Sequence, residues 1–142
     1  MPRFMIQVRA TAMSEAGDFP DDPTLVPRMM AFHDEMARAG VLLDGAGLQP
    51  SSQGFRVQYD AAGQVRVMDG PFAEAKELIA GYTLIEVRSR DEALAWARRF
   101  PAPFPGLPCC IEVRPLMGGI DLPPEEAERI IREQLAAIKR GP

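Results

Sequence analysis

The chain has 142 residues, of which 46% are hydrophobic and 25% charged, proportions that indicate one folded domain and not a disordered chain. Its net charge of −4 argues against direct nucleic-acid binding, since a phosphate backbone requires a basic face. No apolar run approaches the ~20 residues that span a bilayer, and the first ten residues lack a signal-peptide pattern. We therefore expect a cytoplasmic protein with no membrane partner.

Cysteine and histidine usage bears on redox and metal chemistry. Cys109 and Cys110 are adjacent, cannot build an ordinary disulfide framework, and stand in a strand-like run typical of reduced structural thiols. The chain has one histidine, His33, and neither CxxC nor HxxxH spacing. We expect neither a metal site nor a cofactor.

The first half of the chain contains a strand, a loop and a helix. A strand is predicted over residues 3–10, and a loop rich in acids, glycine and proline over residues 14–27. An amphipathic helix then runs from Pro27 to a stop at Gly40. Its inward residues are predicted to be Met29, Phe32, Met36 and Ala37, with His33 at the edge of this face and pointing inward.

Strands and turns dominate the middle of the chain. A short strand over residues 41–50 carries an acid, Asp44. Alternating apolar residues on both sides of the sequence DAAG predict a hairpin over residues 54–70. Another strand begins at Tyr82, whose ring we place in the core with its hydroxyl free to reach a pocket.

Two further helices and a last strand follow. Ser89 and Glu92 form a capping box that opens a helix, and its inward stripe is predicted to be Ala93, Leu94, Ala97 and Phe100. A proline-rich connector leads to a strand over residues 109–117. The segment 122–142 is predicted to be an amphipathic helix, because the charges at its two ends match the helix dipole. Its apolar stripe must be buried on its own domain or on a partner.

This order of elements predicts an α+β fold of the ferredoxin-like split βαβ type with an inserted hairpin. The helices are expected on one face of a mainly antiparallel sheet. The open face needs a cover, and self-association provides one, so we expect a homodimer. The domain is assigned to residues 1–118 and a helical extension to residues 119–142.

Asp69 and His33 are the first candidates for a functional site. Asp69 ends a strand at the bend formed by Gly70 and Pro71, where it acts either as a turn carboxylate or as part of a loop site. Histidine suits proton transfer near neutral pH, although an inward histidine is also an ordinary core residue. The split fold makes a pair between His33 and either Asp44 or Asp69 geometrically feasible.

The stretch DGPFAEAKELIAGYTLIEVRSRDEALAWARRFP, residues 69–101, resembles the YCII-related family and in particular its DGPF subgroup. The resemblance covers roughly residues 3–117 and implies ferredoxin-like domains that pair into a dimeric α+β barrel. It also implies a histidine and an aspartate in a cleft, suggested as an acid–base pair, and a functional link to an extracytoplasmic-function sigma factor. The motif positions are Asp69, Gly70, Pro71, Phe72, Glu74, Lys76, Glu77, Gly81 and Tyr82.

Three hypotheses follow. The first is a cofactor-independent acid–base enzyme for a small polar metabolite, with His33, Asp44 and Asp69 catalytic and a substrate-binding set of Gly70, Pro71, Phe72, Glu74 and Tyr82. The second is a non-catalytic ligand-binding or regulatory module, in which the DGPF loop clamps a ligand and the terminal helix docks on a partner. In the third, DGPF is only a folding signature. Whether the protein is an enzyme stays open at this point.

Overall fold

The structure is a computed structural model, and it describes residues 1–117 and 124–141. No helix within these ranges is long and apolar enough to cross a membrane. The elements, in chain order, are β1 (Arg3–Arg9), α1 (Ala12–Glu15), α2 (Leu25–Arg38), β2 (Leu42–Gly47), η1 (Ser51–Gln53), β3 (Phe55–Tyr59), β4 (Val65–Asp69), η2 (Ala75–Glu77), β5 (Ile79–Glu86), α3 (Arg90–Arg98), β6 (Ile111–Pro115) and α4 (Pro124–Arg140).

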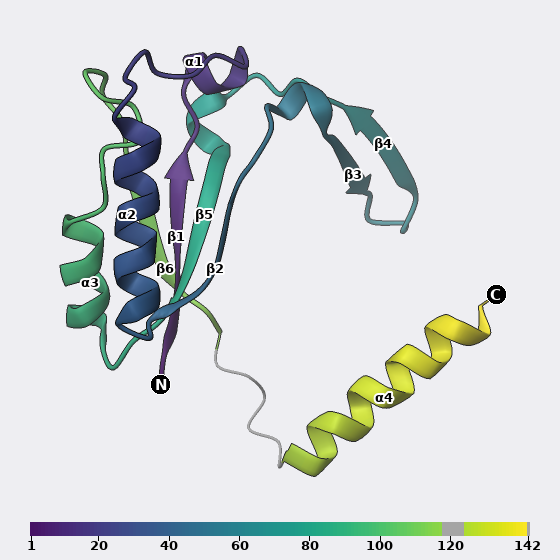
Figure 1. Ribbon diagram of the computed structural model, residues 1–142. Helices are drawn as coiled ribbons and strands as arrows, with labels where there is room; N and C mark the ends of the chain where they lie inside the picture. The colour runs from purple at the N-terminus through teal and green to yellow at the C-terminus, as the bar shows by residue number, and fades with distance from the viewer. Residues whose placement is uncertain (118–123, 142) are drawn as a thin grey trace.

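Four strands form an antiparallel sheet in the order β2-β5-β1-β6. Ile6 of β1 stands opposite Thr83 of β5 on one side and Val113 of β6 on the other. Helices α2 and α3 cover the same face of this sheet (Figure 1). The order, the antiparallel pairing and the single helical layer confirm the predicted ferredoxin-like fold.

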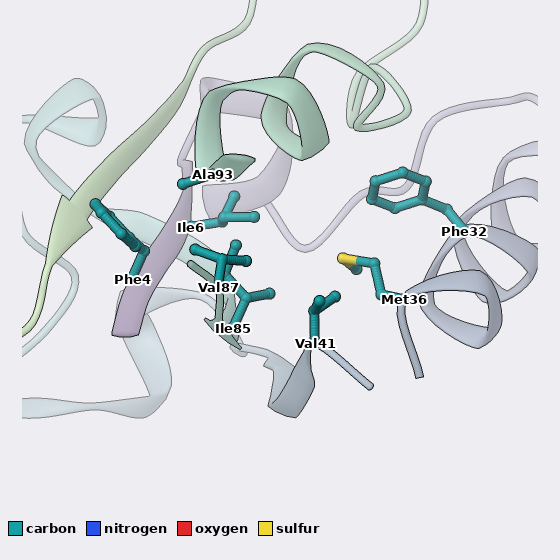
Figure 2. Packing of buried hydrophobic residues seen from close by; sticks show 8 residues of the cluster. All are labelled: Phe4, Ile6, Phe32, Met36, Val41, Ile85, Val87 and Ala93. Atoms are coloured by element: carbon teal, nitrogen blue, oxygen red, sulfur yellow. The ribbon is translucent and has the colours of Figure 1, made fainter. Parts of the chain in front are cut away.

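The hydrophobic core lies between the sheet and these two helices (Figure 2). Alternate residues of the two central strands point into it, because successive side chains of a strand face opposite sides. Full burial of such a side chain contributes roughly 1.5–3 kcal/mol. The buried cluster consists of Phe4, Ile6, Phe32, Met36, Val41, Ile85, Val87 and Ala93.

Helical periodicity identified most of the inward residues correctly. Phe32 and Met36, one turn apart on α2, are both buried as predicted, whereas Ala37 is exposed. On α3 the prediction was wrong for Leu94, which is 41% exposed. Ala93 already occupies the inward position one residue earlier, and Trp96, together with Phe100 beyond the helix, continues its face at helical spacing.

The predicted hairpin is present as β3 and β4, which form a separate two-stranded sheet that extends from the body of the molecule (Figure 1). Asp60 Oδ1 accepts hydrogen bonds from the backbone N–H groups of Ala62 and Gln64, each at 2.9 Å, and Gly63 has a φ of +81°. One face of the hairpin is apolar and exposed, with Phe55, Val57, Tyr59, Val65 and Val67. A lone two-stranded hairpin is marginally stable in water, so this face favours a cover.

Two local features differ from the expectation. The short helix α1 overlaps the start of the predicted loop, and Thr11 caps it: its Oγ1 accepts from the N–H of Ser14 at 3.2 Å. Cys109 and Cys110 precede β6 and do not lie within it, and both thiols are free and exposed. The terminal helix is present as α4, while the start expected before Pro124 lies outside the described residues.

Candidate functional site

His33 lies on the side of α2 that faces β5, and both of its ring nitrogens have partners. Nδ1 is 2.8 Å from the carbonyl oxygen of Met29, and Nε2 is 2.7 Å from Oγ1 of Thr83. A carbonyl oxygen can only accept, so we assign the ring hydrogen to Nδ1. In the neutral imidazole Nε2 then accepts the hydroxyl hydrogen of Thr83.

Thr83 explains why a polar pair occurs at this depth. Its side chain is 2% exposed, and it is the buried polar residue of the part of the chain that the structure describes. Strand alternation directs Gly81, Thr83 and Ile85 to the helical face of the sheet. A buried hydroxyl without a partner costs about 1–3 kcal/mol, and the imidazole of His33 removes that penalty. The ring of Phe100 packs against the imidazole at a centroid distance of 5.9 Å.

A cavity of about 650 Å³ opens beside this pair. Its wall is formed by α2, by the segment between α1 and α2, and by residues of β2, β5 and the connector after α3. Most of the wall is apolar, including Phe19, Leu25, Val26, Met29, Met30 and Leu48. Phe19 and Met30 are 89% and 68% exposed, so the cavity is open to solvent on their side.

A second hollow of about 450 Å³ lies at the edge strand β2. It shares Met29, Met30, His33 and Gly45 with the larger cavity and adds Leu42, Leu43 and Asp44. His33 therefore stands between the two hollows. The pairing of β2 with β5 is irregular between Leu42 and Asp44, and this irregularity leaves Leu43 unpaired and exposed at the edge.

Asp44 has Tyr82 as its partner, and the two ring nitrogens of His33 are occupied by other groups. Asp44 Oδ2 accepts a hydrogen bond from the Tyr82 hydroxyl at 3.3 Å, and Oδ1 accepts from the N–H of Gly45 at 2.8 Å. The charge of Asp44 raises the pKa of Tyr82 above its ordinary value, and partial desolvation and the hydrogen bond add to this. The sequence therefore selected three residues that line these hollows, but the dyad that it made feasible is not formed. The prediction for the Tyr82 ring was wrong, because strand alternation turns it to the sheet face opposite the core.

The DGPF loop is held against the chain that follows β2. The N–H of Gly70 donates to the carbonyl of Gly54 at 3.0 Å, and the Gly70–Pro71 peptide is cis. A Cβ at Gly70 would overlap the carbonyl oxygen of Ser51 and lie 2.7 Å from its carbonyl carbon. Glycine is therefore required here by close backbone approach, not by an unusual φ.

Ser51 connects this loop to α1. Its Oγ accepts from the N–H of Phe72 at 3.0 Å and donates to a carboxylate oxygen of Glu15. The N–H of Ser51 donates to the other carboxylate oxygen of Glu15 at 3.0 Å. The guanidinium of Arg56 stacks over the ring of Phe72, 3.8 Å from its centroid. The residue before Ser51, Pro50, lines the larger cavity, so the DGPF loop supports the cavity wall through its neighbours.

The other candidates taken from the motif do not line either hollow. Asp69 is exposed at the end of β4, opposite Phe55, and belongs to the separate two-stranded sheet. Gly70, Pro71, Phe72 and Glu74 are likewise absent from both walls. The structure thus brings His33, Asp44 and Tyr82 to the hollows. It places the DGPF bend against Ser51, outside both walls.

Sequence reasoning missed Thr83, Ser51 and Glu15. A signal for Thr83 existed, because it is the one polar side chain on the inward face of an otherwise apolar strand. Ser51 and Glu15 are separated by 36 positions and carry no local pattern. Within residues 1–117 and 124–141, no group of three or more His, Cys, Asp or Glu side chains is placed to hold a metal ion.

Comparison with known proteins gives two matches. A family model described as "YCII-related domain" matches residues 3–117. The chain is also similar to a protein of Rhizobium meliloti (strain 1021) named "Uncharacterized protein R00369", with 38% identity over 96 residues, which cover 68% of this chain and 76% of that relative. The matched residues include both hollows and the DGPF loop, and the relative's name assigns no activity.

Proposed function

This chain belongs to the YCII-related family, and from that premise we propose that it binds a small organic molecule beside α2, where His33 accepts a proton from it or returns one. The observation that carries the proposal is the position of Nε2 of His33. This nitrogen is the basic atom of the assigned tautomer, and its residue lines both hollows. Because Nε2 accepts the hydroxyl hydrogen of Thr83, a proton from the bound molecule reaches it through that hydroxyl: the molecule's proton passes to Oγ1 of Thr83 while the Thr83 hydrogen passes to Nε2.

The partners of His33 suit a proton carrier. When Nε2 gains a proton, the ring becomes a cation whose Nδ1–H still donates to the carbonyl oxygen of Met29. This carbonyl holds the ring orientation, the part that a carboxylate plays in many His-containing sites. Asp44 lines the smaller hollow with His33, but its carboxylate is already hydrogen-bonded to the Tyr82 hydroxyl. We assign no proton transfer to Asp69, and the DGPF loop serves in this proposal as a support for the cavity wall.

The single histidine makes a direct experiment available. In ¹⁵N-labelled protein, long-range ¹H–¹⁵N spectra contain one imidazole, and we expect them to show hydrogen on Nδ1 and none on Nε2 in the neutral ring. Native mass spectrometry of freshly purified protein should then detect a retained small molecule. Adding that molecule back to stripped protein should move the His33 signals. A retained molecule that leaves both ¹⁵N shifts unchanged contradicts the proposal.

A non-catalytic binding protein is the second candidate, because both ring nitrogens of His33 have partners without a ligand. The two candidates differ in deuterium exchange. If His33 moves a proton to or from a carbon atom, the retained molecule should incorporate deuterium from D₂O at that carbon in the presence of the protein, and the His33→Gln variant should bind it without catalysing this exchange. Binding with no exchange by either protein favours the non-catalytic candidate.

We also propose that the chain is a homodimer that pairs through the sheet face opposite α2 and α3. Support comes from β5, whose residues on this face, among them Tyr82 and Leu84, are only half-buried. Size-exclusion chromatography with light scattering tests it: the wild type should run at twice 15.6 kDa, and Leu84→Arg should give a folded monomer. A monomeric wild type at all concentrations contradicts the dimer.

A further inference from the structure

We infer that the larger cavity takes an uncharged, mainly apolar molecule with one hydroxyl group, and that this hydroxyl donates a hydrogen bond to the pair formed by His33 and Thr83. The inference rests on the proposed function, since it assumes that the ligand meets His33. It replaces the small polar metabolite expected from the sequence with a different chemical class.

The composition of the wall favours an apolar ligand. A cavity of about 650 Å³ has the size of an ordinary small-molecule site, and such sites are mostly apolar with a few polar groups that fix orientation. Here, six apolar side chains gather along α2 and around it: Phe19, Leu25, Val26, Met29, Met30 and Leu48. A strongly polar molecule would lose its hydration against these six side chains without gaining hydrogen-bond partners from them.

The charges of the lining residues disfavour an anionic ligand. The residues that line the larger cavity include no lysine or arginine, within the ranges that the structure describes. Arg9, at the end of β1, is used elsewhere: its Nε donates to the carbonyl of Lys76 at 3.0 Å, and it forms an ion pair with Glu112. A carboxylate or phosphate would therefore enter an apolar site that already has the acid Asp18 in its wall and no compensating cation.

The directions of the hydrogen bonds of His33 and Thr83 favour a ligand that donates. Nδ1–H of His33 is committed to Met29, and the hydroxyl hydrogen of Thr83 is committed to Nε2. The pair therefore has no free donor, while Oγ1 of Thr83 keeps an acceptor lone pair. A ligand must donate in order to be recognised. A hydroxyl group donates without bringing a charge into the apolar cavity. An alkylammonium group also donates, but it is charged.

Four probes of one shape test these arguments at neutral pH: 4-butylphenol, butylbenzene, 4-butylbenzoate and 4-butylbenzylamine. Affinity is measured by calorimetry, and the site by the ¹⁵N signals of His33. We expect 4-butylphenol to bind best and to shift these signals. Butylbenzene should bind roughly tenfold more weakly, because one hydrogen bond is lost, and the two charged probes more weakly than the phenol. Equal or tighter binding of the benzoate or the amine overturns the inference.

Two variants sharpen the test. The double variant His33→Phe/Thr83→Val removes both acceptor atoms of the pair, so the advantage of the phenol over butylbenzene should disappear while butylbenzene still binds, which also shows that the cavity is intact. Met30→Arg, at an exposed position of the wall, should increase the affinity for the benzoate. A phenol advantage that persists in His33→Phe/Thr83→Val overturns the inference, and so does an unchanged benzoate affinity in Met30→Arg.

The outcomes separate this inference from the proposed function. If the probes shift the His33 signals but show no preference for the hydroxyl, the chemical class is wrong and the site stands. If the probes bind and the His33 signals do not move, or if none binds, the site is wrong, and the inference fails with it.

Discussion

His33 Nε2 and Thr83 Oγ1 lie 2.7 Å apart, although the two residues are 50 positions apart in the chain. This contact joins α2 to β5 at the point where the core gives way to the larger cavity. Because Thr83 is buried, its hydroxyl has few alternative partners for this hydrogen bond to the imidazole. The contact therefore serves both stability and the proposed chemistry, and the two roles can be separated by measurement.

The hydrogen bond should be visible in a double-mutant cycle. Thr83→Val removes the donor to Nε2, and we expect unfolding free energy in urea to fall by about 1–3 kcal/mol. In a His33→Phe background the same substitution should cost about 1 kcal/mol less, because the hydroxyl no longer has its acceptor. Additive effects of the two substitutions would show that the contact contributes nothing to stability. Thr83→Ser, which keeps the hydroxyl, is the matched control.

Gly70 is predicted to be the most sensitive position of the DGPF loop. In Gly70→Ala the new methyl group would overlap the backbone of Ser51, which cannot rotate away as a side chain can. We expect a loss of about 1–3 kcal/mol of unfolding free energy, as for other overpacked sites. Asp69→Asn is the comparison, because its exposed carboxylate should be worth less than ~0.5 kcal/mol. The reverse ranking of the two variants would contradict this account of the loop.

Ser51 is predicted to hold the DGPF loop to α1. Ser51→Ala removes the acceptor for the N–H of Phe72 and one donor to Glu15, so the Phe72 amide should exchange with solvent faster. Glu15→Gln weakens the same connection from its other end and should produce a smaller increase. Hydrogen exchange followed by NMR measures both, with the Ala62 amide in the remote turn as an internal control. Unchanged Phe72 exchange in Ser51→Ala would mean that the hydroxyl is not the anchor.

The ionisation of Tyr82 should make the stability of the folded protein depend on pH in a definite direction. Its pKa in the folded state is raised, first by the charge of Asp44 and then by desolvation, so its contribution to stability is present below the ordinary tyrosine pKa. That contribution is lost as pH rises through the folded-state pKa, since the unfolded chain ionises first. Asp44→Asn should move the phenol titration, followed by ultraviolet absorbance, to lower pH. Tyr82→Phe identifies the transition, and an unshifted titration in Asp44→Asn would exclude Asp44 as the cause.

The terminal helix should be dispensable for the stability of the domain. Ile131, Leu135 and Ile138 of α4 are all more than half exposed, so they are not part of the buried core. A chain ending at residue 117 should keep the thermal midpoint of the full-length protein. A lower midpoint would show that α4 packs on the domain. If the midpoint is unchanged but the mass by light scattering is halved, the helix holds the oligomer together.

The elements of this fold were largely readable from local pattern. β-prone residues without helical spacing predicted the first strand, the spacing of Phe32 and Met36 predicted α2, and alternation on both sides of the DAAG turn predicted the hairpin. These signals are local because each depends on residues within one or two turns of the chain. The same kind of signal missed α1, whose capping box pairs Thr11 with Ser14 and lacks the usual acid.

Sequence alone therefore determined the type of most elements, the family, and three residues of the candidate site: His33, Asp44 and Tyr82. Only the tertiary structure decided which side chains meet. It paired His33 with Thr83, turned Asp44 toward Tyr82, and placed Asp69 in a separate two-stranded sheet. The physical reason is strand pairing: the register between distant strands, and the face to which each side chain then points, are set by contacts between segments far apart in the chain and leave no local trace.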